Sequence, residues 1–181
     1  MKQVANVRLA TWRDVDEVAK LSEKLLQALA QASHSDYFGG VDSDEAAESM
    51  MAPSALIVAE DERNDLVGFL LLLVTNEEQE HKYTEVFPEI YRKGQAIIVN
   101  GYGVHPNKTK GGIATAMLAF AKGYALTNGY TQFVGTIHPE NVASEKSLKH
   151  ISSKMEKAEP FIHRTKDGRN LPRQYFIQEL A

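Results

Sequence analysis

Leu66–Val74 reads LVGFLLLLV, a strand-length stretch that is apolar at odd and even positions alike. Because successive side chains of a strand point to opposite faces of a sheet, both faces of this strand must be covered. The stretch is far shorter than the roughly 20 residues that a helix needs to cross a bilayer. The sequence therefore predicts a central strand of a sheet, packed between two layers that are most simply helices.

Strand and helix patterns alternate along the rest of the chain. The stretch Ala55–Ala59 forms a predicted hairpin with Leu66–Val74, and the polar stretch Thr75–Gln95 is an excursion for which a partly helical structure is one alternative. No internal repeat or linker divides the chain, so we expect a single domain over residues 1–181. The other expected elements are strands at Val7–Ala10, Ala96–Val104 and Gln132–Ile137, helices that begin near the capping residues Thr11, Ser43 and Asn141, a helix from Ile113 to a stop at Asn128, and a terminal hairpin over Pro160–Leu180 that turns at Asp167 and Gly168.

Composition excludes several classes of protein. The chain has 181 residues with 43% hydrophobic and 24% charged side chains, and it contains no cysteine. These values are typical of a globular domain, and without cysteine neither a disulfide nor a thiolate-based site can form. The first residues, MKQVANVR, lack the apolar core of an export signal, and the six histidines show no metal-ligand spacing. We therefore expect a soluble, cytoplasmic protein that uses no metal and no membrane.

Charge is unevenly divided along the chain. Residues 1–90 carry 7 Lys and Arg against 18 Asp and Glu, whereas residues 91–181 carry 13 against 6. One half of the sequence favours cationic partners and the other favours anionic ones, unless folding interleaves the two halves. Nucleic acid is a disfavoured partner, because the net charge is -4 and no helix concentrates Lys and Arg with aromatic residues.

The segment HPNKTKGGIATAM, at residues 105–117, links a predicted strand to a predicted helix through a glycine-containing turn. The first N–H groups of a helix have no carbonyl partner within the helix, and they can hold a phosphate or pyrophosphate. The segment lacks both the GxxxxGK[ST] and the GxGxxG patterns, which disfavours ATP or a dinucleotide as the ligand. Two adjacent glycines are also compatible with a loop that only starts a helix.

Two further matches favour a phosphate-binding turn over a loop that only starts a helix. Val104-His105-Pro106 followed by Gly112-Ile113-Ala114 resembles the acyl-CoA signature of the GNAT superfamily of N-acyltransferases, in which a strand ending in V-x-P leads into a [QR]-x-x-G-x-[GA] loop. Downstream, Asn141 and Ser144 resemble the N-x-x-[AS] helix start of that family. The resemblance implies an α/β (α+β) fold with a central mixed, mostly antiparallel sheet of six to seven strands flanked by about four helices. It also implies that acetyl-CoA binds to Tyr102, Gly103, Val104, Thr109, Lys110, Gly111, Gly112, Ile113, Ala114, Thr115, Asn141 and Ser144.

Three positions depart from the family pattern. Thr109 stands where Gln or Arg is usual, so Lys108 or Lys110 is expected to replace that contact to the pyrophosphate. Leu148 stands where many members carry a tyrosine that protonates the departing thiolate. On the strand before the loop, where many members place a glutamate base, the sequence offers no carboxylate. The general acid and base are therefore not assigned by the motif.

The resemblance implies direct transfer of an acetyl group from acetyl-CoA to a primary amine of a small molecule, amino acid or protein. A base must accept a proton from the amine, and a donor must stabilise the oxyanion. The resemblance implies that the backbone N–H near Val104 is the oxyanion donor. His138 is the candidate base, acting through a water molecule, with a structural or surface role as the alternative. Tyr102 is the candidate acid near the sulfur, with aromatic packing as the alternative.

Two other expectations concern partners. The acidic residues Glu77, Glu78 and Glu80 suit a cationic acceptor, although they are also compatible with a solvated loop. The resemblance further implies a possible homodimer. The competing function is a non-catalytic acyl-CoA-binding module, a sensor or scaffold of the same fold, which Leu148 and the missing carboxylate favour.

Overall fold

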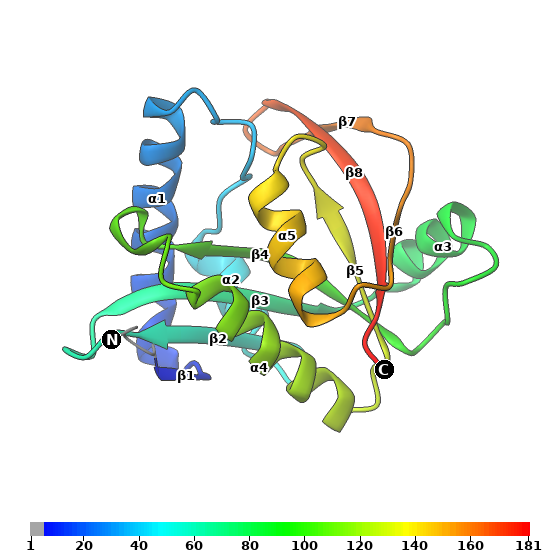
Figure 1. The fold of residues 1–181 in the computed structure, drawn as a ribbon, viewed down its shortest axis with the longest axis horizontal. Helices are drawn as coiled ribbons and strands as arrows, with labels where there is room; N and C mark the ends of the chain where they lie inside the picture. The colour runs from blue at the N-terminus through cyan, green and yellow to red at the C-terminus, as the bar shows by residue number, and fades with distance from the viewer. Residues whose placement is uncertain (1–5) are drawn as a thin grey trace.

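The computed structural model describes residues 6–181, which form eight strands and five α-helices (Figure 1). The main path of the sheet has the order β1-β2-β3-β4-β5-β8-β6, and β7 pairs with β8. Only the β4/β5 pair is parallel within these residues. The strands are β1 (Asn6–Leu9), β2 (Ala55–Glu60), β3 (Leu66–Val74), β4 (Ala96–Val104), β5 (Gln132–Ile137), β6 (Met155–Lys157), β7 (Phe161–Arg164) and β8 (Asn170–Glu179), and the helices are α1 (Val15–Gln31), α2 (Ser43–Glu48), α3 (Glu77–Val86), α4 (Ile113–Thr127) and α5 (Val142–Ile151). The expected mixed, mostly antiparallel α/β (α+β) fold is confirmed.

The central strand predicted at Leu66–Val74 is also confirmed. β3 lies between β2 and β4, and its side chains alternate between two core clusters. Leu70 and Leu72 pack in the cluster that contains the apolar face of α4. Phe69 and Leu71 pack in the cluster that contains α1 and α2. All four side chains are fully buried, so helices cover both faces of the sheet, as the apolar pattern requires.

The sheet opens between β4 and β5. Their ladder runs from Ala96↔Gln132 to Val99↔Gly135 and ends there. Beyond this point β4 continues beside β3, and β5 continues beside β8. The β4 register shifts at Asn100, which is the extra residue of a β-bulge; the two nearby glycines of the strand had indicated such a bulge. The bulge and the divergence together leave a notch in the sheet.

Differences from the sequence prediction lie in the number and the starts of elements. Residues 6–181 form eight strands and five α-helices, where six to seven strands and about four helices were expected: the three-residue strand β6 is additional, and α3 forms inside the polar excursion. Asn76 caps α3 by accepting a hydrogen bond from the N–H of Gln79. Asp42, rather than the predicted Ser43, caps α2, because its side chain accepts from the N–H of Glu45. Thr11 opens a 3-10 turn, after which α1 begins at Val15.

Both ends of the chain bear on the predictions. The terminal hairpin is confirmed: β7 and β8 pair from Phe161↔Arg173 to Arg164↔Asn170, and the turn contains Gly168 with φ 85°. The prediction that the first residues, MKQVANVR, lack an export signal concerns residues 1–8, and residues 1–5 of this segment lie outside the described residues. In the described part of the chain, every helix is too short or too polar to cross a bilayer.

Candidate active site

A cleft of about 1370 Å³ occupies the notch between β4 and β5. Its floor is formed by Asn100–Val104 of β4 and by Thr136–His138 at the end of β5. Its walls are lined by residues of α1, the segment after α1, the start of α5 and the β7–β8 hairpin. Figure 1 shows where these elements lie in the fold. Seven of the twelve predicted cofactor-binding residues line the cleft: Tyr102, Gly103, Val104, Thr109, Ala114, Asn141 and Ser144.

The other five predicted residues, Lys110, Gly111, Gly112, Ile113 and Thr115, lie outside the lining of the cleft. Lys110, Gly111 and Gly112 are exposed, and the side chain of Ile113 is buried in the core below α4. A role for Gly111 to Ile113 in binding would therefore come from backbone N–H groups rather than from side chains.

The start of α4 is well suited to an anion. Gly112 is the residue before the helix, and its backbone has φ 75° and ψ 14°, in the left-handed region that favours glycine. A Cβ placed on Gly112 would meet nothing within 4 Å, so the approach to the helix is open. The first turn contains no acidic residue and has no side-chain cap. The N–H groups of the first turn are thus available to a phosphate.

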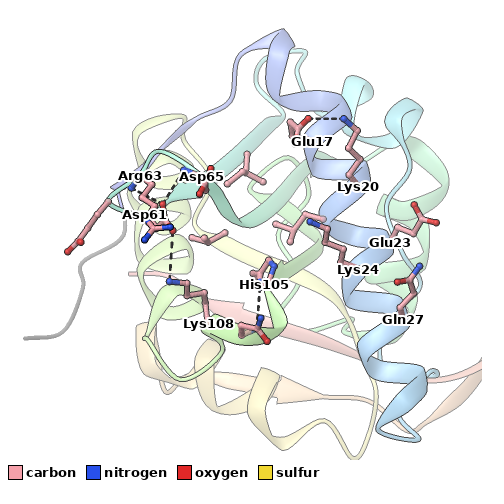
Figure 2. A pocket seen from close by; sticks show the side chains of 15 residues that line it. Glu17, Lys20, Glu23, Lys24, Gln27, Asp61, Arg63, Asp65, His105 and Lys108 are labelled. Carbon is pink, nitrogen blue, oxygen red and sulfur yellow. Dashed lines mark hydrogen bonds and ion pairs between the residues drawn. The ribbon is translucent and has the colours of Figure 1, made fainter.

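Lys108 lies on a second cavity of about 860 Å³, between α1 and the turn that joins β2 to β3. Figure 2 shows its ammonium group directed at Asp61, with Nζ 3.9 Å from Oδ2. Lys110 has no carboxylate within 4.0 Å among residues 6–181. Of the two lysines expected to replace the missing Gln or Arg, Lys110 is therefore the one without a carboxylate partner in the described part of the chain.

Tyr102 joins β4 to α5 across the cleft. Its hydroxyl lies 2.5 Å from Ser144 Oγ and donates to the Ser144 carbonyl at 3.1 Å. Asn141 Oδ1 accepts from the N–H of Ser144, which fixes the start of α5 as the sequence predicted. Burial raises the pKa of Tyr102 to about 12, and the hydrogen bond to Ser144 opposes that rise. The phenol is therefore protonated at neutral pH and can act as a proton donor.

Leu148 is fully buried one turn after Ser144 and belongs to the core. The family tyrosine expected at this helix position is thus replaced by an apolar core residue. The hydroxyl of Tyr102 instead reaches α5 from the facing strand. Tyr102 and Ser144 were predicted from the sequence as separate site residues, and the structure shows that their hydroxyl groups lie within hydrogen-bond distance of each other.

His138 is 5% exposed, and both of its ring nitrogens are engaged. Nδ1 accepts from the N–H of Glu140 at 3.0 Å, so the neutral ring carries its proton on Nε2. Nε2 lies 2.9 Å from Asp36 Oδ2, to which it donates. The ring also packs against Tyr37, with centroids 4.6 Å apart. Neither nitrogen offers a free lone pair, which favours a role in holding the segment after α1 over the role of base.

The acidic residues of the polar excursion lie away from the cleft. Glu80 is buried, and it accepts hydrogen bonds from the Thr75 hydroxyl and from the N–H of Gly94. Glu77 and Glu78 are exposed on α3 and are not part of the lining. These positions fit the solvated-loop alternative for Glu77 and Glu78, and a structural role for Glu80.

Sequence reasoning missed Arg173 of β8, which lines the cleft and is 7% exposed. Its Nη1 donates to the carbonyls of Asp36 and Pro172, at 2.8 and 2.9 Å. A signal was present: Leu171 and Arg173 occupy alternate buried positions of one strand, so the arginine stands at an inward position. In residues 6–181 no group of three His, Cys, Asp or Glu side chains is arranged to hold a metal ion.

Comparison with known proteins agrees with this geometry. The sequence model of the acetyltransferase (GNAT) family matches residues 20–150. No curated protein sequence matches the chain. Similar solved structures include a GNAT superfamily phosphinothricin acetyltransferase from Sinorhizobium meliloti in complex with AcCoA, with 18% identity, a TM-score of 0.65, and coverage of 100% of this chain and 90% of that chain.

The names of two other similar structures state a protein substrate. The ribosomal-protein-S18-alanine N-acetyltransferase from Escherichia coli is 9% identical, with a TM-score of 0.68 and coverage of 98% of this chain and 95% of that chain. The ribosomal-protein-alanine N-acetyltransferase from Brucella melitensis is 18% identical, with a TM-score of 0.68 and coverage of 97% and 99%. At these identities the likeness shows the fold. Since the family match extends over most of the sequence, the chain belongs to the GNAT family of acetyltransferases.

Proposed function

We propose that this protein is a cytoplasmic N-acetyltransferase that moves an acetyl group from acetyl-CoA to a primary amine of a small molecule, amino acid or protein. The observation that carries the proposal is the cleft at the β4/β5 notch, which has the open start of α4 beside it. Acetyl-CoA supplies an activated acetyl group as a thioester. The N–H groups after Gly112 and the side chain of Lys110 would hold its phosphates, and β4 backbone at Tyr102–Val104 would face its pantetheine arm.

Within the cleft, the residues of this chain have distinct chemical tasks. The N–H near Val104 can stabilise a developing oxyanion, because the bulge at Asn100 turns this part of β4 into the notch. The hydroxyl of Tyr102 can donate its proton to the departing sulfur as the carbon–sulfur bond breaks and the carbon–nitrogen bond forms. Ser144 then supports the phenolate that remains. The amine loses its proton to water in the open cleft.

His138 has a different task in this proposal. To act as a base it would have to give up the hydrogen bond from the Glu140 N–H or transfer its proton to Asp36. We therefore propose that His138 is a positioning residue, which holds Asp36 and Tyr37 at the rim of the cleft. The competing proposal, an acyl-CoA-binding module without turnover, draws on Leu148, while the Tyr102–Ser144 pair favours an enzyme.

Two measurements test the proposal. Thermal unfolding should show a rise in Tm of about 5–10 °C at a concentration of acetyl-CoA or CoA one hundred times its dissociation constant, and much smaller rises with ATP or NAD. Release of free CoA thiol in the presence of a panel of amines should then distinguish an enzyme from a binding module. An equal Tm shift with ATP would contradict the acyl-CoA site, and a CoA shift without thiol release would favour the non-catalytic module.

A further inference from the structure

The guanidinium of Arg173 is a buried cation that has no carboxylate partner in the part of the chain that the structure describes. Among residues 6–181, no carboxylate oxygen lies within 4.0 Å of it, and its hydrogen bonds all run from Nη1 to two carbonyls. The nearby Asp36 carboxylate is bound to His138 instead. A buried charge is costly unless it is paired and hydrogen-bonded, so an unpaired one indicates a partner that arrives from elsewhere.

The unused face of this guanidinium is accessible from the cleft. Nε and Nη2 of Arg173 make no hydrogen bond within residues 6–181, and neither atom is among the sealed, unsatisfied polar atoms of the structure. Since Arg173 lines the cleft and is otherwise enclosed, these two donors face the cleft. Nε and Nη2 together form one edge of the guanidinium fork, the geometry that binds both oxygens of a carboxylate.

The charges around Arg173 also favour an anionic ligand. Burial lowers the pKa of Arg173, Asp36 raises it and Arg169 lowers it. Arg169 is itself engaged, with Nε 2.9 Å from Asp167 and Nη2 donating to the Gly39 carbonyl. Arg164, Lys166 and Arg169 also line the cleft from this hairpin, against one carboxylate, Asp167, so the β7–β8 wall is cationic.

Arg173 lies on an element of the cleft that carries none of the predicted cofactor residues. The predicted cofactor residues of the cleft belong to β4, the loop before α4 and the start of α5. Arg173 instead lies on β8, next to Gln174, which pairs with Ile137 at the diverging end of β5, and it contacts the segment after α1. An acceptor bound at Arg173 and an acetyl-CoA bound by the predicted cofactor residues would therefore enter the notch from different sides and meet between them.

We propose that Arg173 binds the carboxylate of the acyl acceptor, so that the acceptor is a free amino acid rather than an internal or N-terminal amine of a protein. The inference rests on the proposed function and narrows it. A competing explanation assigns Arg173 only to the two carbonyl bonds that hold the segment after α1. Only the first explanation predicts that an acceptor without its carboxylate binds more weakly.

The test compares free L-amino acids with the corresponding amino acid amides, which keep the amine and lose the negative charge. Wild-type protein should acetylate at least one amino acid with a kcat/KM about 10- to 100-fold above that of its amide, the range for a charge-assisted pair. In Arg173→Met this preference should disappear through a higher KM for the amino acid, while the KM for the amide stays within about threefold. Arg173→Lys, which keeps the charge without the fork, should recover part of the preference.

A matched control is Arg13→Met, which removes the same charge from an exposed position that is not part of the cleft lining. It should change the amino acid KM by less than about threefold. Equal rates with amino acids and amides in wild type, or an equal loss with both in Arg173→Met, would overturn the inference and leave Arg173 as a loop clamp. If Arg173→Met does not fold, the wild-type comparison and Arg173→Lys still decide. Failure of the proposed function is distinct, because it shows as no Tm shift with CoA and no thiol release with any amine.

Discussion

Gly135 stands where the cleft begins, because it is the last residue of β5 that pairs with β4. A Cβ added there would lie 2.9 Å from the backbone oxygen of Val99 and 2.9 Å from Cε1 of Phe176, whereas ordinary contacts start at 3.4 Å. The ring of Phe176 is buried, and the Val99 oxygen belongs to a strand. Neither can move aside freely, so Gly135→Ala must push β4 and β5 apart by several tenths of an ångström.

The magnitude follows from two opposing effects. Overpacking a core by a methyl group costs about 1–3 kcal/mol, and replacing glycine returns about 0.4–1 kcal/mol by restricting the unfolded chain. We expect a net loss of about 1–2 kcal/mol, which for a chain of this size lowers Tm by about 2–8 °C. Acetyl-CoA should also stabilise the variant less than wild type, because the notch is distorted.

The same substitution at Gly123 is the control. Gly123 lies exposed inside α4, and a Cβ there would meet nothing within 4 Å. Gly123→Ala should therefore raise stability by up to about 1 kcal/mol, since alanine favours the helix. Thermal unfolding followed by circular dichroism measures both variants. A Gly135→Ala protein that melts at or above the wild-type temperature would refute the claim that this glycine is needed for the close approach of β4 and β5.

Three further predictions test other parts of the molecule. Tyr102→Phe should lower kcat by about 10²–10⁴-fold while the Tm shift with acetyl-CoA is retained, and an unchanged kcat would assign Tyr102 to packing. Gly112→Asp should abolish CoA binding measured by calorimetry in a folded protein, because it places a carboxylate at the anion site; unchanged affinity would contradict that site. Hydrogen bonds from Arg8 hold the pKa of Asp14 and Glu60 below 3.8 and 4.5, so their stabilising effect is present above these values and is lost as the pH falls through the lowered pKa. Arg8→Met should remove this part of the acid dependence of Tm, and identical pH profiles would show that the network contributes nothing.

Features with a local cause could be predicted from the sequence. The burial of Leu66–Val74 on both faces follows from its composition, and the helix start at Asn141 follows from capping chemistry. The start of α2 was misplaced by one residue, because Asp42 and Ser43 are both good capping residues and only the backbone decides between them. The loop before α4 was found because its glycines and its spacing are contiguous in the chain.

The rest depended on contacts between distant parts of the chain. Asp36 and His138 are 102 residues apart, and the sequence could not show that the imidazole is held on both sides. The same applies to Arg173 and Asp36, which are 137 residues apart. From the sequence alone, a histidine or an arginine is expected to have its ordinary protonation and hydrogen-bonding behaviour. The partners that change this behaviour are brought close to it only by the fold. This is why the loop before α4 could be named from contiguous residues, whereas the contacts of His138 and Arg173 could not.

The uneven charge along the sequence becomes a polarity across one cleft. The cleft residues contributed by α1, α2 and α3 include three carboxylates, Asp16, Glu23 and Glu45, against two lysines, Lys20 and Lys82, and Asp42 just before α2 adds a fourth carboxylate. The β7–β8 wall has the opposite sign. Folding therefore does not interleave the two halves at this place, but brings them face to face around one cavity. A zwitterion is oriented by such a field, with its carboxylate toward Arg173 and its ammonium group toward the acidic wall, whereas a simple amine has no reason to approach the cationic side.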